Sequence, residues 1–201
     1  MDVVDTCSGW PSHVIAVLDR WAGLGSVVLP DGARLIGHVP EVAELAYLHR
    51  VPPPLPEEGL NKLRAQLEMP VPAELLEFYK CANGLSAFSD SLNIYGLRGN
   101  YRRSDMLAVS AQPYDIITPN QHERPAQMKL NHVIVGGYQY DGSKVAVGDQ
   151  AEVYRCERRD GRKRLNQWPS FRAWIEVEID RLSKVFDDAG HCPDREETLP
   201  R

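Results

Sequence analysis

Residues 71–97, VPAELLEFYKCANGLSAFSDSLNIYGL, decide the fold, because one stretch holds a helix, its stop signal and the first strand of a sheet. Pro72 suits the first turn of the helix, where no N–H donor is needed. The buried side of this helix carries large apolar residues: Leu75, Phe78, Tyr79 and Ala82. Asn83-Gly84 ends the helix, since glycine adopts the left-handed conformation without a steric penalty. Residues 92–97 then alternate as a half-buried strand does.

The chain before this stretch predicts another helix, a stiff connector and an N-terminal appendage. The helix begins at Glu57 and ends at Met69-Pro70, and three leucines line its apolar side: Leu60, Leu63 and Leu67. Residues 51–56, VPPPLP, form neither a helix nor a central strand, because proline lacks an N–H donor and fixes φ. We interpret them as a polyproline-like connector, although Pro53 to Pro56 also fits a PxxP ligand. Residues 1–50 predict the appendage, with a helix over 11–22 and a hairpin of strands over 26–29 and 33–37.

The chain after residue 97 predicts an antiparallel meander and a closing helix. Residues 100–131 contain three prolines and weak periodicity, so we expect an irregular segment with one short helix. Short turns separate the apolar runs that follow: 132–138, 144–148, 151–156 and a shorter one near Leu165. Ser170 can cap a long final helix that Gly190 ends, and residues 191–201 are a polar tail that we expect to be loose. The prediction is an α+β domain over residues 57–190, with a mostly antiparallel sheet and packed helices.

Composition places the chain among ordinary globular proteins. It has 201 residues, of which 43% are hydrophobic and 25% charged, and no apolar run is long enough to span a bilayer. Asp2 and Asp5 stand where a secretion signal would carry basic residues. The four cysteines lie far apart without a C-x-x-C pair, so neither a zinc site nor a disulfide framework is predicted. A cytoplasmic location is the simplest expectation.

The net charge of −5 is unevenly distributed, because residues 1–100 hold 12 acidic and 7 basic residues while residues 101–201 hold 16 of each. An acidic surface disfavours nucleic acid and favours a basic partner, although ordinary solubility explains the charge equally well. Residues 158–164, RRDGRKR, are the one basic run that could bind phosphates. No aromatic residue interleaves with this run, so we do not expect nucleic-acid binding.

No motif in the sequence carries recognisable chemistry. Residues 136–142, GGYQYDG, match neither phosphate-binding glycine pattern, and the six histidines lie outside metal-ligand spacing. A metal could in principle bind four residues near the end of the final helix: Asp187, Asp188, His191 and Cys192. We interpret these four residues as a polar turn, and Cys81 as a buried thiol. The sequence therefore predicts no catalytic residue, no cofactor and no metal, which lowers the prior for an enzyme.

Residues 57–187 resemble the SUKH superfamily, which includes fungal cell-wall-synthesis regulators and many bacterial immunity proteins. The matching features follow the family's order: two helices, Asn83-Gly84, a strand, an aliphatic strand with Gly136-Gly137, and a helix announced by Ser170, Phe171 and Trp174. Residues 1–56 have no family counterpart, and the segment 100–131 is unusually long. All matched residues have structural roles, so the resemblance implies the fold and transfers no site residue. Members of the family act by binding proteins, often toxin nucleases or deaminases.

The leading hypothesis is an immunity protein that occludes a toxin and performs no catalysis itself. Acidic and aromatic residues beside the predicted strands would match a basic toxin groove. This expected patch consists of Asp90, Tyr95, Tyr101, Asp105, Tyr138, Tyr140 and Asp141. Each tyrosine fits a half-buried sheet position at least as well. The alternative is a regulatory or scaffold module without a toxin partner, which the connector and the appendage favour slightly. An unrecognised hydrolase or nucleic-acid enzyme is a third possibility, and the oligomeric state stays open.

Overall fold

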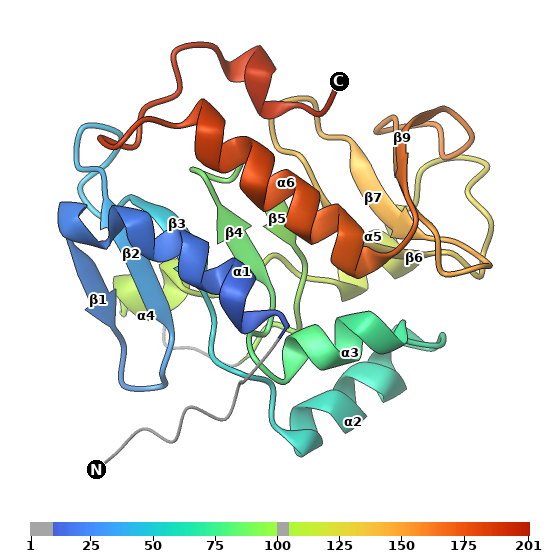
Figure 1. The fold of residues 1–201 in the computed structure, drawn as a ribbon. Helices are drawn as coiled ribbons and strands as arrows, with labels where there is room; N and C mark the ends of the chain where they lie inside the picture. The colour runs from blue at the N-terminus through green and yellow to red at the C-terminus, as the bar shows by residue number, and fades with distance from the viewer. Residues whose placement is uncertain (1–9, 100–104) are drawn as a thin grey trace.

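The computed structural model describes residues 10–99 and 105–201, and its centre is one open antiparallel sheet (Figure 1). The nine strands described pair in chain order, each antiparallel to the next. They are β1 Ser26–Val28, β2 Arg34–His38, β3 Tyr47–Val51, β4 Leu85–Ala87, β5 Leu92–Ile94, β6 Val133–Gly137, β7 Lys144–Val147, β8 Val153–Cys156 and β9 Arg164–Trp168. The prediction of an α+β fold with an antiparallel sheet is confirmed.

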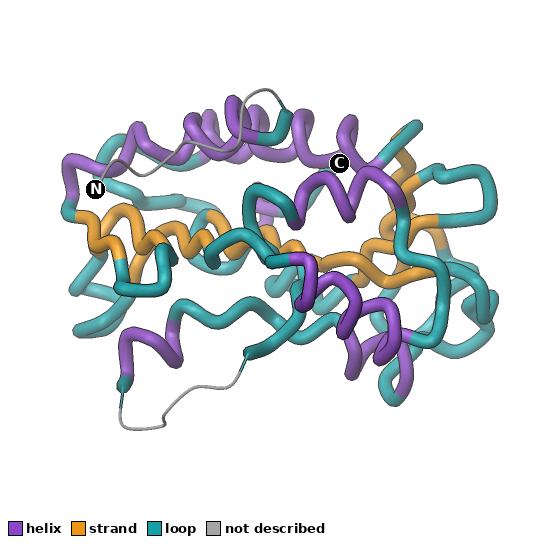
Figure 2. Tube along the Cα trace, turned by 90° about the horizontal axis from the view of Figure 1, so that it is seen from below, coloured by secondary structure: helices purple, strands orange, loops and turns teal. Residues whose placement is uncertain are grey.

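Helices cover both faces of the sheet and one end of it. They are α1 Ser12–Val17, the 3-10 helix η1 Leu18–Leu24, α2 Glu57–Leu67, α3 Ala73–Tyr79, α4 Met106–Ser110, α5 Ile117–Gln121, α6 Phe171–Val185 and the 3-10 helix η2 Arg195–Thr198. In Figure 2 the sheet lies between a layer that contains α1 and α6 and an opposite layer that contains α4. The pair α2–α3 closes the lower end of the sheet in Figure 1.

The N-terminal helix and hairpin are present, and a strand that the sequence pattern did not indicate joins them to the rest of the sheet. Strand β3 pairs with β2 over four residue pairs and with β4 through Arg50 and Ser86. Helix α1 packs against α6, and η1 packs against β2. The proline connector is fixed by two backbone bonds, in which Leu55 and Asn83 donate to the carbonyls of Tyr79 and Pro53. The strands within residues 26–51 therefore form one edge of the same sheet, and the helices before them pack onto the rest of the fold.

The C-terminal tail is docked, whereas the sequence predicted a loose one. Arg181 donates to the carbonyl oxygens of Glu197 and Thr198 at 2.7 and 2.8 Å. Arg155 donates to the carbonyl oxygen of Pro200 at 3.2 Å. Hydrogen bonds from these two arginines, on α6 and β8, thus hold a polar tail whose low hydrophobicity had suggested that it would be loose.

The cysteines also differ from the expectation. Cys81 is disulfide-bonded and only partly buried, so the prediction of a buried thiol at this residue is wrong, and the spacing of the cysteines did not reveal the disulfide. Cys156 and Cys192 are free thiols. Among residues 10–99 and 105–201, no helix combines the length and the apolarity needed to cross a lipid bilayer.

Close contact between α6 and the sheet depends on Gly136 in β6, which has no side chain. Ser170 caps α6 by accepting a bond from the Ala173 N–H at 3.2 Å, as its position in the sequence predicts. The helix then buries Trp174 fully, and the Trp174 indole donates to the Tyr138 hydroxyl at 3.0 Å. A Cβ at Gly136 would lie 2.7 Å from the Trp174 ring and 2.3 Å from the Asn93 carbonyl oxygen. Gly136 therefore sets the distance between helix and sheet.

We expect Gly136→Ala to lower the free energy of unfolding by about 2 kcal/mol, because neither contact can relax cheaply. Chemical denaturation followed by circular dichroism measures this change. Gly23→Ala is the matched control, since a Cβ there meets nothing within 4 Å. The control is expected to shift stability by less than about 1 kcal/mol, and equal losses in both variants would contradict the packing argument.

Candidate functional site

Two hairpin turns meet at one end of the sheet and bring together residues that lie far apart in the sequence. The β4–β5 turn covers residues 88–91 and the β6–β7 turn covers residues 138–143. They lie side by side because Asn93 in the three-residue strand β5 pairs with Gly137 at the end of β6. The expected patch residues Asp90, Tyr138, Tyr140 and Asp141 all belong to these turns, so the structure gathers four of the seven.

The three other patch residues have different fates. Tyr95 follows β5 and is only 8% exposed. Asp105 caps α4, where it accepts a bond from the Ala108 N–H at 3.0 Å, so it lies away from the two turns. Tyr101 falls outside the described residues. Among the tyrosines of the turns, Tyr138 is 2% exposed while Tyr140 is 48% exposed, so Tyr140 alone offers its ring to a partner.

Both aspartates of the turns form ion pairs inside the molecule. Asp90 pairs with Arg50, and Asp141 pairs with the buried Arg155. Burial alone would raise the pKa of Asp141, but hydrogen bonds from Ser143 and Arg155 outweigh burial and lower it. The charges of these two aspartates are therefore used within the fold, and they contribute little to attracting a basic partner.

The β4–β5 turn has an unusual backbone. Three consecutive residues without a glycine among them have positive φ: Phe88 at 57°, Ser89 at 50° and Asp90 at 66°. This conformation costs roughly 1–2 kcal/mol for each L-residue. Backbone and side-chain bonds hold it, since the Ser89 N–H donates to the Leu48 carbonyl at 2.9 Å and the Asn93 amide donates to the Asp90 carbonyl at 2.8 Å. The turn is thereby fixed in a single shape beside Tyr140.

A groove of about 470 Å³ opens beside these turns, and we call it the acidic groove. The turns supply Ser89 and Tyr140, the β2–β3 loop supplies Val42, and the chain after α6 supplies Phe186, His191 and Arg195. Val42 is 61% exposed, so an apolar and an aromatic side chain both face solvent across this groove. Phe186 is buried beneath them and packs against Phe88 at a ring distance of 5.2 Å.

Residues 186–191, which follow α6 and form one wall of the groove, are held in place by hydrogen bonds. The Trp21 indole donates to the Asp187 carbonyl oxygen at 2.7 Å. A tight loop then closes, because the Asp187 N–H donates to the His191 carbonyl and the Gly190 N–H donates to the Asp187 carbonyl, both at 3.0 Å. The His191 N–H also donates to the Asp187 carboxylate at 2.8 Å. His191 also lies 3.4 Å from Glu41 across the groove. The groove is therefore preformed.

Two of the segments that border this groove carry mostly negative charge. Residues 39–46 and 186–198 together carry seven carboxylates and one arginine: Glu41, Glu44, Asp187, Asp188, Asp194, Glu196 and Glu197, with Arg195. Each of these seven residues is exposed. Asp188 pairs with Arg20, and His191 contacts Glu41 and Asp187, but Glu44 and Glu196 have no ion pair within 4 Å among the described residues. The two segments therefore remain acidic in total, although none of the seven carboxylates lines the groove itself.

The groove has little chemistry of its own to offer. Burial raises the pKa of the Cys192 thiol at its edge, so this sulfur stays protonated at neutral pH. Burial likewise raises the pKa of Cys156 to about 11. Within residues 10–99 and 105–201, no three His, Cys, Asp or Glu residues gather in a way that could hold a metal ion. The acidic groove is therefore suited to binding a partner, and we identify no nucleophile beside a base among its described residues.

Sequence reasoning identified Tyr140 and missed the rest of the groove. Val42 and His191 come from loops, where periodicity carries no signal, and Arg195 begins the short 3-10 helix η2. Phe186 belongs to the predicted apolar stripe of the final helix, but the pattern does not indicate a groove. The run DDAGHCPDREE, residues 187–197, gave the available indication, because five of its eleven residues are acidic. A scan against protein-family models finds no match to the chain. A search of curated proteins finds no similar sequence either.

Proposed function

We propose that this protein binds and neutralises a basic protein toxin, in the manner of an immunity protein, and that the acidic groove is the surface that receives it. The observation that carries the proposal is the combination of an exposed aromatic and an exposed apolar side chain, Tyr140 and Val42, in the groove with seven exposed carboxylates on the two segments that border it. Such a surface suits a partner with basic residues around an apolar anchor.

A nuclease domain is a suitable partner on charge. Enzymes that bind nucleic acid line their grooves with Lys and Arg to neutralise phosphates. The carboxylates on the two bordering segments would pair with these cations and steer the encounter. An anchor residue of the toxin would enter the groove between Tyr140 and Val42, above Phe186, where water is displaced. Occlusion of the toxin's own groove then requires no chemistry from this chain, so we propose that it is not an enzyme.

Two further parts of the proposal rest on sequence. The ordered match of residues 57–187 to the SUKH pattern supports membership of that superfamily, whose members act by binding proteins. A cytoplasmic location follows from composition, although the disulfide at Cys81 argues against it, since disulfides persist in oxidising compartments. Cell fractionation tests the location, and recovery outside the cytoplasmic fraction would overturn that part.

The decisive experiment joins capture to growth. Tagged full-length protein is used to capture partners from its native cell, and each captured protein is expressed in a host with and without this chain. Immunity requires that one partner stops growth alone and that co-expression restores growth. Capture limited to partners that are harmless when expressed would reject immunity and favour a regulatory or scaffold module.

Alanine at Tyr140 tests the surface itself. Tyr140→Ala is expected to weaken binding of the captured toxin by about thirtyfold, the effect of a central anchor worth about 2 kcal/mol. Leu130→Ala is the matched control, because Leu130 is 83% exposed and precedes β6, at the end of that strand opposite Tyr140. Isothermal titration calorimetry measures both, and a similar loss in the two variants would exclude the acidic groove as the binding surface.

A further inference from the structure

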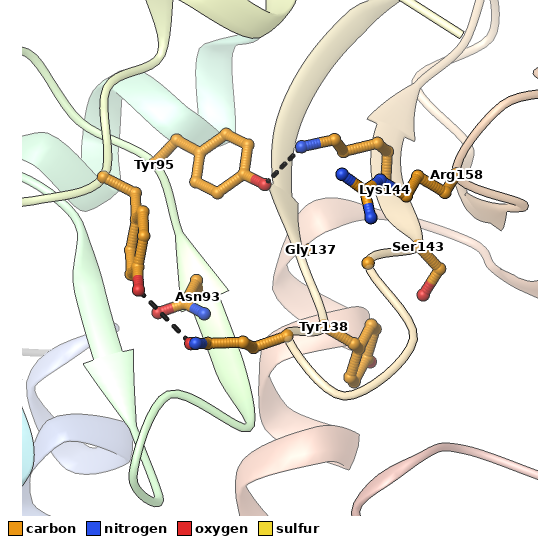
Figure 3. Close-up of a pocket in the computed structure, with 10 residues that line it drawn as sticks. Asn93, Tyr95, Gly137, Tyr138, Ser143, Lys144 and Arg158 are labelled. Carbon is orange, nitrogen blue, oxygen red and sulfur yellow. Dashed lines mark hydrogen bonds between the residues drawn. The ribbon is translucent and has the colours of Figure 1, made fainter.

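A second hollow, of about 290 Å³, lies on the other side of Gln139 from the acidic groove, and we call it the tyrosine pocket (Figure 3). Its floor is the Asn93–Gly137 pair that joins β5 to β6. Successive strand residues point to opposite faces, and Gly136 faces Trp174 of α6. Gly137 and the pocket therefore lie on the sheet face opposite α6.

Two cations line this pocket, and neither forms an ion pair with a carboxylate of the described residues. Figure 3 shows Lys144 directed at the Tyr95 hydroxyl, with Arg158 alongside. The Lys144 ammonium donates to this hydroxyl at 3.2 Å. Among the described residues, no carboxylate lies within 4 Å of Lys144 or Arg158. Burial lowers the pKa of Lys144, the charge of Glu123 opposes this and the charge of Arg158 adds to it.

Arg158 is exposed and Lys144 is half-buried, and their like charges repel each other across the pocket. An anion between the two cations would convert the repulsion into two charge-assisted hydrogen bonds. Arginine and lysine are also the side chains that proteins use to bind carboxylates and phosphates.

The floor of the pocket presents an acceptor that lacks a donor. Asn93 is 4% exposed, and its amide nitrogen donates to the Asp90 carbonyl oxygen at 2.8 Å. Its Oδ1 atom is buried and receives no hydrogen bond within the described part of the chain. A buried polar atom without a partner is destabilising, which makes this oxygen a place where a ligand O–H would be favoured.

The walls are aromatic and the floor is open. The rings of Tyr95 and Tyr114 lie 6.3 Å apart on one side, and the Tyr114 hydroxyl donates to Gln139 at 3.2 Å. A Cβ at Gly137 would lie 2.9 Å from the Tyr95 hydroxyl and 2.6 Å from the Ser143 carbonyl oxygen. Glycine at this position therefore keeps the space free, and the walls suit a short carbon skeleton.

We propose that the tyrosine pocket binds a small oxyanion that carries a hydroxyl group, such as a hydroxy acid or a polyol phosphate. The oxyanion lies between Lys144 and Arg158, the hydroxyl donates to Asn93, and the carbon skeleton packs against Tyr95 and Tyr114. This site is separate from the acidic groove, and it does not depend on the identity of a protein partner.

Nuclear magnetic resonance titration of the full chain tests the site. The probes are glycolate against acetate, glycerol 3-phosphate against inorganic phosphate, and glycerol as the uncharged reference. We expect saturable shifts of the Gly137, Ser143 and Lys144 amides, with the hydroxylated member of each pair binding about fivefold more tightly through one additional hydrogen bond. Absence of saturable shifts at these amides up to about 10 mM of every probe would overturn the proposal. Equal affinities within both pairs would overturn it as well. Whichever pair binds more tightly identifies the oxyanion.

A charge substitution supplies the second arm. Arg158→Gln should weaken glycolate or glycerol 3-phosphate about tenfold, because it removes one charge-assisted contact. Arg159→Gln is the matched control, since Arg159 is exposed on the same strand-to-turn segment and does not line the pocket. An equal effect of both substitutions would mean nonspecific attraction to a basic surface and would reject the site. Lys144→Gln removes the other cation that would contact the anion, and it should weaken binding of the same ligands.

Discussion

Acidification from pH 7 to about pH 4.5 is expected to lower the free energy of unfolding by about 2.5 kcal/mol through His49 alone. His49 on β3 is fully buried, and burial lowers its pKa from 6.5 to about 3. Its ring packs between Trp21 and Phe88, at 5.1 and 4.7 Å between ring centres. Within the described residues no carboxylate lies close enough to form an ion pair with this ring, so nothing compensates a charge on it.

The sign follows from which state binds the proton. The unfolded chain protonates His49 below about pH 6.5, whereas the folded protein does so only near pH 3. The stabilising contribution is therefore complete above the unfolded pKa and decreases as the pH falls toward the folded pKa. The Phe88 N–H donates to Nδ1 of His49 at 3.2 Å, and a proton on Nδ1 would break this bond too.

Denaturant unfolding at several pH values measures the effect in wild type and in His49→Gln. The variant is expected to be less stable at pH 7 but to lose much less stability between pH 7 and about pH 4.5, a range above most carboxylate titrations. His122→Gln, at an exposed histidine, should keep the wild-type slope. If wild type and His49→Gln show parallel slopes, the buried neutral histidine is not the cause.

The sequence predicted the elements whose pattern is long or whose ends carry a chemical signal. Helix α2 begins at Glu57 and ends at Leu67, next to the predicted Met69-Pro70 stop. Helix α6 begins directly after Ser170. The three predicted strands after residue 131 appear as β6, β7 and β8, and the short one near Leu165 appears as β9. Each of these elements is marked by a cap, a turn dipeptide or an apolar run.

The elements that sequence reasoning missed are too short or too fully buried to show a period. Strand β4 has three residues, all buried, so it presents no alternation. Strand β3 ends at the first residue of the proline run, whose composition dominated the interpretation of that region. The segment 105–131 contains two short helices, α4 and α5, where one was predicted. Five residues are too few for a helical pattern to be distinguished from irregular structure.

The candidate site was only partly predictable, for a different reason. Strand ends and turns indicated where Asp90, Tyr140 and Asp141 would gather, since neighbouring antiparallel strands return to the same end of the sheet. The exposure of the residues near the end of β6 could not be predicted. The pairing of β6 with β7 shifts in register between Ile134 and Gly136, so simple alternation does not give the face of the sheet to which each later residue points. The sequence did not indicate that Arg155 is buried either. Arginine is rarely buried unless it is paired, and the sequence does not show which residue lies close enough to pair with it.

Asp141→Asn is expected to lower the free energy of unfolding by about 3 kcal/mol, the lower end of the range for breaking a buried ion pair. Arg155 is 5% exposed and donates to Ser143, Asn166 and the Pro200 carbonyl oxygen at 2.7, 3.0 and 3.2 Å. All these acceptors are neutral, so Asp141 alone supplies the countercharge among the described residues. Removing this charge leaves a guanidinium in a place that water reaches poorly, and loosening of the Pro200 contact should follow.

Asp160→Asn is a closely matched control for this substitution. Both aspartates accept a bond from a backbone N–H two residues later at 2.9 Å, Ser143 for Asp141 and Arg162 for Asp160, and an asparagine oxygen can keep that bond. The two sites differ in the paired arginine, because the Arg162 side chain is 68% exposed while that of Arg155 is 6% exposed. The control should change stability by less than about 0.5 kcal/mol. Equal losses would assign the effect to the turns. A large loss of stability in the Asp141 variant alone would have a further consequence. Weaker toxin binding by that variant would then reflect impaired folding, so the interface should be mapped with Tyr140 variants instead.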